Sequence, residues 1–323
     1  QQDIADRDTY FEEVMKSVND VYASLEKARI KEGKLKKSEA GPEGPQQYTN
    51  AQSRDRLIQN INEIGSTLQE NRKKIAALEK EYGVSVTVGH SARLMAGIRL
   101  IKDAIDRGEL GRVAFMEANF SNERALELTP QTWRWYKDRA PGGNLSQLCI
   151  HQFDVLHMLG GAVTEISSMS SKLSPVGAEV DDQSMSTIRF ADGKLGYVGS
   201  SWTSPGVFSV RVFGSKGLMH YEIDFGTWDT PHLLHNASVL YIQRGKDGWG
   251  KREELKIPES DMFRAELEMF AGSCVSGKPG ELTAYNGNVA VAMVNAALRS
   301  IEKNGQAVKV ADILSETRKK AGA

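Results

Sequence analysis

The chain has 323 residues, which is enough for two domains, and its formal net charge is −1. The near-zero charge argues against a polyanion-binding protein, and no basic cluster with interleaved aromatic residues suggests binding to nucleic acid. No run approaches the roughly 18 apolar residues of a transmembrane helix, so we expect none. The two cysteines cannot build a disulfide scaffold, and the six histidines show no metal-ligand spacing, so no metal site is expected.

The first 82 residues carry two runs of apolar residues at the three- and four-residue steps of a coiled-coil seam. The first run covers residues 5–37 and the second ends at Tyr82. A loop at 38–45 separates them, because its two Pro and two Gly do not continue a helix. We therefore predict an antiparallel α-helical coiled-coil hairpin over residues 1–82. It would act as a stalk, or as an arm for a coiled-coil partner, rather than in catalysis.

Residues 83–323 are predicted to form an α+β domain with a predominantly antiparallel, open sheet and helices on one face. The expected strands cover 84–88, 112–120, 163–172, 184–190, 194–202, 207–213, 217–223, 238–243 and 252–257. The expected helices cover 92–108, 145–160, a stretch that begins at Asp261, and 285–303. One face of the sheet should pack on the first two of these helices. The other face is left open, which predicts a homo-oligomer.

One stretch of the second domain combines helical spacing with polar residues. It runs from Gly142 to Gly161 and contains His151 and Asp154. Residues three positions apart lie on one face of a helix, so the imidazole and the carboxylate can address one pocket together. From the spacing alone, a buried amphipathic helix with two polar residues at its edge explains the pattern equally well.

The order of motifs resembles that of the Gfo/Idh/MocA oxidoreductases from about residue 75 to about residue 315. The motifs are VTVGHSARLMAGIRLIKDAIDRGELGRVAFMEANFS, then Trp133-Arg134, then the Gly-Gly…His-x-x-Asp stretch. The resemblance implies a C-terminal sheet domain that receives a sugar or polyol, an N-terminal Rossmann domain, and NAD or NADP as cofactor. However, no G-x-G-x-x-G opens a helix, and Glu79-Lys80-Glu81 lacks the Pro of the family's Glu-Lys-Pro motif. We therefore expect no cofactor-binding residues and no bound cofactor for this chain alone.

The resemblance also assigns roles to three residues of the Gly142–Gly161 stretch. His151 would face the nicotinamide and the substrate hydroxyl and exchange a proton with that hydroxyl. Asp154 would orient His151 or bind a substrate hydroxyl. Gln147 stands where the family commonly has an Asp, and it can bind a hydroxyl but cannot act as a base.

A second group of candidate substrate-binding residues consists of Arg93, Trp133 and Arg134, because aromatic faces and Arg forks suit sugars or carboxylated substrates. The competing interpretation is that Trp133 is a core residue beside a salt-bridged Arg134. Lys172 is added to the substrate-binding set because it ends a strand that faces the site in similar proteins.

The predicted function is therefore the substrate domain of an NAD(P)-dependent sugar or polyol oxidoreductase acting on CH–OH groups, inactive alone for want of a nucleotide-binding domain. The alternatives are a non-enzymatic oligomerisation or sugar-binding module and an artificial or recombined fusion. The family is mostly cytoplasmic, whereas a chain that begins with Gln suits a processed, exported protein. The compartment stays open.

Overall fold

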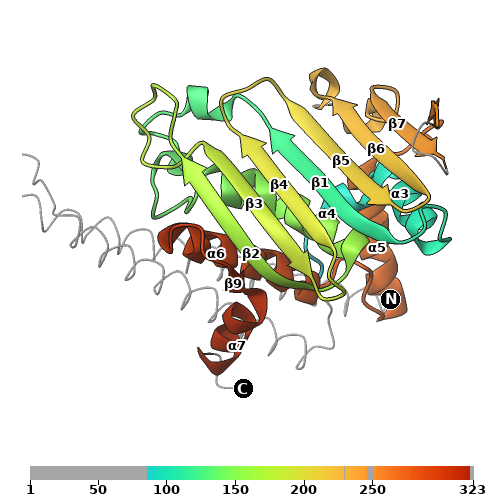
Figure 1. Cartoon of the computed structure of the whole chain (residues 1–323). Coiled ribbons are helices and arrows are strands. Elements are labelled where there is room, and N and C mark those ends of the chain that lie inside the picture. Colours follow the sequence, from blue (N-terminus) through green and yellow to red (C-terminus); the bar gives the residue numbers. More distant parts are fainter. Residues whose placement is uncertain (1–85, 229, 246–249, 321–323) are drawn as a thin grey trace, which may run out of the picture. The chain divides into compact units, whose positions relative to one another are not determined.

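The computed structural model describes residues 86–228, 230–245 and 250–320. The predicted hairpin of residues 1–82 and the predicted domain boundary lie outside these ranges. Within them, nine strands form one sheet in the order β8-β7-β6-β5-β1-β4-β3-β2-β9 (Figure 1). The bounds are β1 Val113–Ser121, β2 Val163–Ser171, β3 Gln183–Phe190, β4 Leu195–Ser201, β5 Val207–Gly214, β6 Gly217–Asp224, β7 Ser238–Arg244, β8 Arg252–Glu254 and β9 Val308–Lys309. A mixed α/β domain with a large, mostly antiparallel sheet is thus confirmed.

Strand β1 is the exception to the antiparallel order. It lies in the middle of the sheet, antiparallel to β5 and parallel to β4, with Glu117 opposite both Arg211 and Tyr197. Alternate residues of β1 are buried, including Met116 and Ala118, as expected for a strand with one face on the core. The sequence pattern predicted this strand but not its central place, because local periodicity carries no information on pairing partners.

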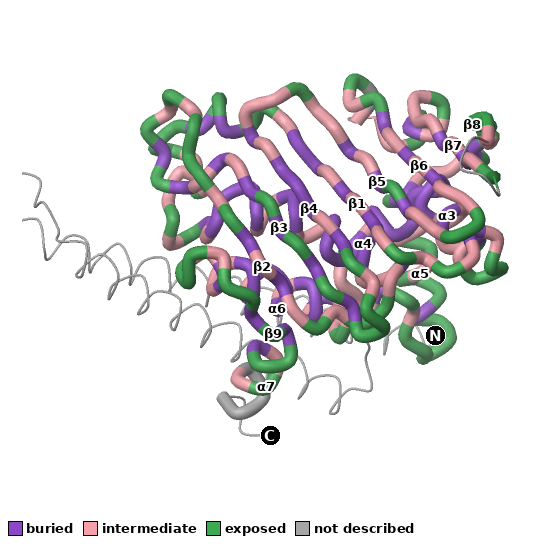
Figure 2. Tube along the Cα trace, in the orientation of Figure 1, coloured by how far each residue is buried: buried purple, intermediate pink, exposed green. Residues whose placement is uncertain are grey.

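The described part of the chain has five α-helices, namely α3 Ala96–Asp106, α4 Ile150–Gly160, α5 Met262–Ser276, α6 Ala284–Glu302 and α7 Val310–Lys320. Of these, α3, α4 and α6 pack on one face of the sheet, α7 contacts β2 near the edge, and α5 packs on the 3-10 turn η1 Ser91–Leu94 (Figures 1 and 2). As predicted, α3 contacts β6 and β7 while α4 contacts β1 and β4; α6 packs against β2. None of the described helices combines the length and apolar character needed to cross a bilayer.

Three details of the helices and the first strand differ from the prediction. The helix expected at 92–108 is a 3-10 turn, η1 Ser91–Leu94, followed by α3, because Met95 between them has an extended ψ of 130°. Helix α7 follows the two predicted closing helices. The described residues of the strand expected at 84–88 make only one bridge, between Thr87 and Thr283.

Helix α4 sits between the sheet and α6, and it is therefore buried on most of its circumference. Phe153, Val155 and Leu156 are fully buried. At its end, Gly160 lies so close to the sheet that a Cβ there would come within 2.3 Å of the Met116 side chain. This close contact holds the end of the helix against β1.

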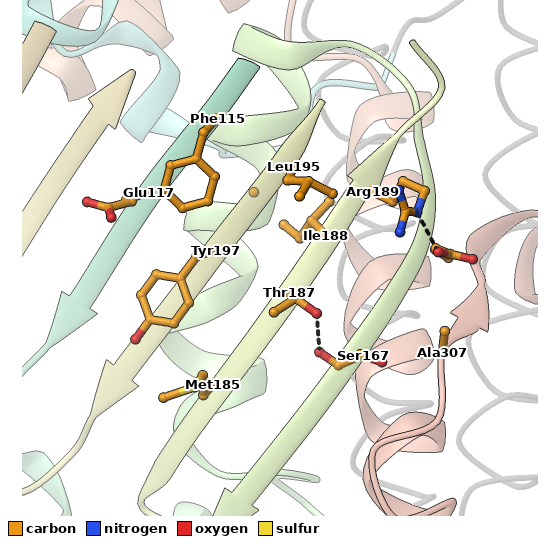
Figure 3. Close-up of a pocket in the computed structure, with 12 residues that line it drawn as sticks. Phe115, Glu117, Ser167, Met185, Thr187, Ile188, Arg189, Leu195, Tyr197 and Ala307 are labelled. Carbon is orange, nitrogen blue, oxygen red and sulfur yellow. Dashed lines mark hydrogen bonds and ion pairs between the residues drawn. The ribbon is translucent and has the colours of Figure 1, made fainter. Parts of the chain in front are cut away.

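The opposite face of the sheet has no covering helix in the described residues and is hollowed across β1, β4, β3 and β2 (Figure 3). The concavity has a volume of about 660 Å³ and is lined by apolar side chains that include Phe115, Leu195 and Tyr197. Met185 and Leu195 are 47% and 46% exposed. Arg189 and Glu165 form an ion pair of 2.7 Å at its margin.

Candidate functional site

A second, smaller pocket of about 310 Å³ lies where η1, the end of β1 and the start of α4 meet. Aromatic side chains form much of its wall, namely Phe120, Trp202, Phe208, Trp228 and Phe263. Its polar lining consists of Ser91, Asn122, Arg124, Arg134, Gln147 and His151. The volume is at the lower end of the range of small-molecule sites, which are typically about 300–1,000 Å³.

A π-helical turn at Leu145–Cys149 continues directly into α4, and together they position the polar residues of the wall. Gln147 and His151 are four residues apart, so they lie on the same side of this helical segment and both line the pocket. Leu145 and Cys149 are buried on the other side. The helical spacing noted in the sequence therefore separates a core face from a pocket face.

His151 is held in the pocket wall by two neighbouring rings. Its centroid lies 6.0 Å from that of Phe120 and 6.0 Å from that of His90. Burial, followed by the charge of His90, lowers the pKa of His151 to about 4, although the carboxylate of Asp154 opposes this shift. The imidazole is consequently neutral at physiological pH, and burial makes it a weaker base than an exposed histidine.

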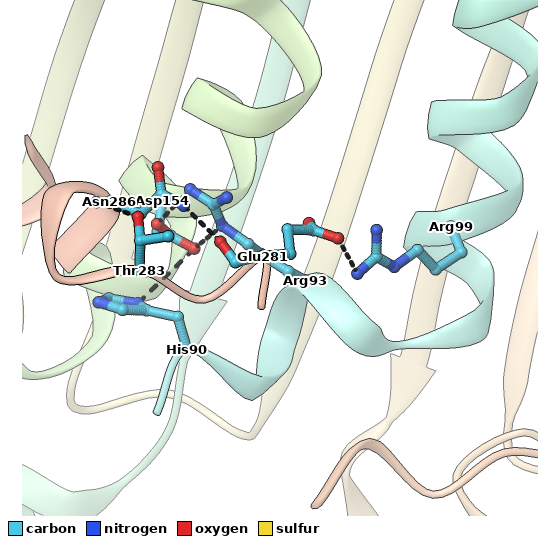
Figure 4. A network of polar contacts seen from close by, with 7 residues as sticks. All are labelled: His90, Arg93, Arg99, Asp154, Glu281, Thr283 and Asn286. Carbon is cyan, nitrogen blue, oxygen red and sulfur yellow. Dashed lines mark hydrogen bonds and ion pairs between the residues drawn. The ribbon is translucent and has the colours of Figure 1, made fainter. Parts of the chain in front are cut away.

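Asp154 and Arg93 are paired with each other behind the pocket wall (Figure 4). Arg93 donates from Nε to Oδ2 at 2.5 Å and from Nη2 to Oδ1 at 2.7 Å. His90 Nδ1 lies 3.6 Å from the same Oδ2. Both charged residues are buried, so each is the counter-ion that the other needs. Neither is among the residues that line the pocket, and a direct contact of either with substrate stays a prediction.

Arg134 belongs to the 3-10 turn Trp133–Trp135 and also lines the pocket. Its Nε donates to Gln147 Oε1 at 3.1 Å, and its guanidinium lies 4.4 Å from the centroid of the Trp133 ring. Trp133 is 42% exposed and is therefore not a core residue; no ion pair of Arg134 is found among the described residues. The structure thus joins Arg134 and Gln147 to His151, with Trp133 as a platform outside the pocket.

Lys172 lies elsewhere. Its ammonium donates to the carbonyl oxygen of Ala178, within the loop that joins β2 to β3, and it does not line the pocket. The sequence interpretation in turn missed Arg124 and Asn122, which do line it. Their only signal was their position directly after the predicted strand 112–120, where loops often carry binding residues.

A dinucleotide does not fit the glycine pair that precedes the π-turn. A Cβ on Gly143 would come within 2.0 Å of the Asp181 carbonyl oxygen, and one on Gly142 within 2.7 Å of Leu298. The protein's own atoms fill the space that a pyrophosphate would need, although a helix begins nearby. The described residues also hold no cluster of three or more metal-ligating side chains.

Comparisons with known proteins agree on one family. A profile of the GFO/IDH/MocA C-terminal domain matches residues 98–220. The chain is 33% identical to a solved oxidoreductase from Desulfitobacterium hafniense, with a TM-score of 0.71, covering 76% of this chain and 70% of that protein. It is 23% identical over 264 residues to the myo-inositol 2-dehydrogenase of Thermotoga maritima, covering 80% and 72% of the two chains. A levoglucosan dehydrogenase in complex with NADH and levoglucosan shares the fold, at 18% identity and a TM-score of 0.63 over 75% and 70% of the chains.

The motif order, the sheet with its helical layer, and the 33% identity over most of the D. hafniense protein all support the same conclusion. The chain belongs to the Gfo/Idh/MocA family of oxidoreductases.

Proposed function

We propose that the described domain is the substrate half of an NAD(P)-dependent oxidoreductase that acts on a CH–OH group of a sugar or polyol. The observation that carries this proposal is the position of His151, a neutral imidazole in the wall of an aromatic-lined pocket of about 310 Å³. The names of two relatives, a myo-inositol dehydrogenase and a levoglucosan dehydrogenase, support the substrate class.

The pocket offers what a cyclic polyol requires. Aromatic faces such as Phe120 and Trp228 can pack against the C–H face of a sugar ring. Gln147 and Ser91 supply hydrogen-bonding groups for hydroxyls. When the alcohol is oxidised, its oxygen loses a proton, and His151 is the lining base that can accept it.

Among the described residues, the Gly142-Gly143 turn is filled by the protein's own atoms and offers no space for the pyrophosphate of a hydride acceptor. A levoglucosan dehydrogenase of the same fold holds NADH, which supports a nicotinamide as that acceptor. We therefore expect the chain alone to bind a polyol without oxidising it.

Thermal unfolding of the full chain with millimolar levoglucosan or myo-inositol, without cofactor, tests the binding half of the proposal. A ligand that binds the folded state raises the melting temperature. His151→Gln should reduce that rise. His157→Gln is the matched control, because His157 lies in the same helix but bonds the Gly161 carbonyl at 3.0 Å, outside the pocket. An equal loss in both variants, or no rise with any sugar, would count against the proposal.

The activity of a chimaeric protein would distinguish a dehydrogenase from a non-enzymatic sugar-binding module. Residues 86–320 would be joined to the nucleotide-binding part of the D. hafniense oxidoreductase, and NAD(P)H formation measured with a panel of polyols. We expect turnover that His151→Gln removes. A chimaera that binds sugars but never forms NAD(P)H would favour the binding module.

The open sheet face supports a second proposal, that the domain forms a homo-oligomer. The concavity over β1, β4, β3 and β2 exposes Met185 and Leu195, and such an apolar surface on a sheet favours burial against a second copy (Figure 3). Sedimentation of the full chain should show a dimer or larger species that Leu195→Asp weakens. Lys278→Asp, an exposed change after α5, is the control. A monomer at all concentrations would exclude this role.

A further inference from the structure

We infer that the pocket selects an acidic monosaccharide, whose carboxylate or phosphate binds at the two guanidinium groups of Arg124 and Arg134. The inference deepens the proposed function and rests on it for the sugar part of the ligand. The anion-binding part rests on the charges and donors of the pocket alone.

The ionisable side chains that line the pocket are Arg124, Arg134 and His151, and no Asp or Glu is among the described lining residues. His151 is neutral, as shown above. Neither arginine forms an ion pair with a described residue. A pocket wall with two unpaired positive charges is therefore complementary to an anion.

The two arginines also act on each other. The pKa of Arg134 is lowered, first by burial and then by the positive charge of Arg124. Two guanidinium groups that repel one another beside a cavity, without an internal counter-ion, gain stabilisation when an anion enters between them. Arg124 is exposed and Arg134 is partly buried, and the effect of Arg124 on Arg134 shows that the two positive charges lie near each other.

Two carboxyl groups are held beside elements that line the pocket, those of Asp154 and Glu266. Arg93 donates two hydrogen bonds to the carboxylate of Asp154 and is its counter-ion. Glu266 lies behind Gly89, with its Oε1 3.1 Å from the place of a Cβ on that glycine, and burial raises its pKa. Burial thus shifts Glu266 toward its neutral form, and no carboxylate stands among the described residues that line the pocket.

The hydrogen-bonding groups of the pocket are mainly donors. Gln147 Oε1 accepts the Arg134 Nε–H, which orients the guanidinium and leaves the Gln147 amide nitrogen as a donor. Trp202 is fully buried in the wall, and its indole N–H has no acceptor among the described residues. Asn122 Oδ1 already accepts from the Arg124 backbone N–H. Carboxylate and phosphate groups, which are rich in acceptors, match such a lining.

Calorimetric titration of the full chain tests the inference with four probes at constant ionic strength: D-glucose, D-glucuronate, D-glucose 6-phosphate and inorganic phosphate. We expect one of the two acidic sugars to bind at least about tenfold more tightly than glucose, as a charge-assisted bidentate contact allows. The acidic sugar that binds more tightly identifies the anion as carboxylate or phosphate.

Three variants should abolish this preference: Arg134→Gln, Arg124→Gln and Gln147→Glu. The Gln147→Glu variant keeps the size of the side chain and its acceptor oxygen, but it places a carboxylate against the Arg134 guanidinium. Arg139→Gln is the charge-matched control, because Arg139 stacks on Tyr136 at 4.8 Å and does not line the pocket. Gln147→Glu also serves as the safeguard against misfolding, since it removes no contact of the protein with itself.

Each outcome distinguishes the two proposals. Acidic sugars that bind no tighter than glucose, or a preference that Arg139→Gln reduces as much as Arg134→Gln, would overturn the inference while leaving a sugar site intact. Glucose 6-phosphate that binds no tighter than inorganic phosphate would support the anion site but count against the sugar site of the proposed function. Failure of all four probes would overturn both.

Discussion

The guanidinium of Arg93 and the carboxylate of Asp154, 61 residues apart in the chain, meet through two hydrogen bonds of 2.5 and 2.7 Å. Arg93 is 3% and Asp154 1% exposed. The ion pair links η1 to α4. Other residues of these two elements line the pocket. The sequence interpretation placed both residues in the substrate site; they bind each other, and a contact with substrate stays a prediction.

Removal of one partner from this buried pair should be strongly destabilising. We expect Arg93→Met to lower the free energy of unfolding by about 3–5 kcal/mol, because it leaves a buried carboxylate unpaired. The double variant Arg93→Met/Asp154→Leu should recover much of that loss. Urea unfolding measures both. Arg99→Met is the control, since the half-exposed ion pair of Arg99 with Glu281 should contribute only about 0–1 kcal/mol. Equal losses for Arg93 and Arg99 would contradict the buried pair.

The pKa of His151 predicts a pH dependence of stability. Because its pKa is about 4 in the folded state, against an ordinary value of 6.5, the unfolded state binds the proton more tightly. The stabilisation of the folded state that comes from the lowered pKa of His151 is therefore fully present above about pH 6.5 and is lost as the pH falls to about 4. The wild-type protein should lose more stability over this window than His151→Gln, on the order of 3 kcal/mol. Denaturant unfolding of both proteins at several pH values measures this difference. Free energies of unfolding that fall in parallel with pH would contradict the prediction.

The two cysteines should react at very different rates. Cys274 is exposed on α5, whereas Cys149 is buried with its Sγ 3.4 Å from Ser184 Oγ. Burial raises the pKa of the Cys149 thiol to about 12, so the reactive thiolate is scarce there. A disulfide reagent should modify one thiol rapidly in the folded chain and the second only after denaturant is added. Rapid modification of both thiols, located by mass spectrometry, would show that the start of α4 opens in solution.

The chain alone should not bind a nicotinamide nucleotide with micromolar affinity. The sequence has no G-x-G-x-x-G at a helix start, and the Gly142-Gly143 turn is filled by Asp181 and Leu298. Titration of NADH or NADPH should therefore leave nucleotide fluorescence unchanged, apart from linear dilution. A dehydrogenase known to bind NADH serves as the positive control. A saturable signal at micromolar nucleotide would contradict this expectation.

Local pattern was enough to predict most of the elements of the described domain. Strands β2 to β7 fall within a residue or two of their predicted ranges, because alternating burial has a period of two and the Asp192-Gly193 turn marks its own hairpin. The helical spacing around His151 likewise predicted the helix at 145–160, which forms as the π-helical turn and α4. His151 lines the pocket, whereas Asp154 pairs with Arg93. The position of Met95, where the first helix breaks, had no such periodic signal.

What the sequence alone determined is therefore the set of strands and helices, the family resemblance and the short list around His151, since each depends on neighbours along the chain. Only the tertiary structure decided that β1 lies at the centre of the sheet, that Arg93 neutralises Asp154, and that Arg124 joins Arg134 at the pocket. These relationships join residues far apart in sequence. Burial and charge pairing across such distances depend on how the elements pack, and no local spacing encodes that packing.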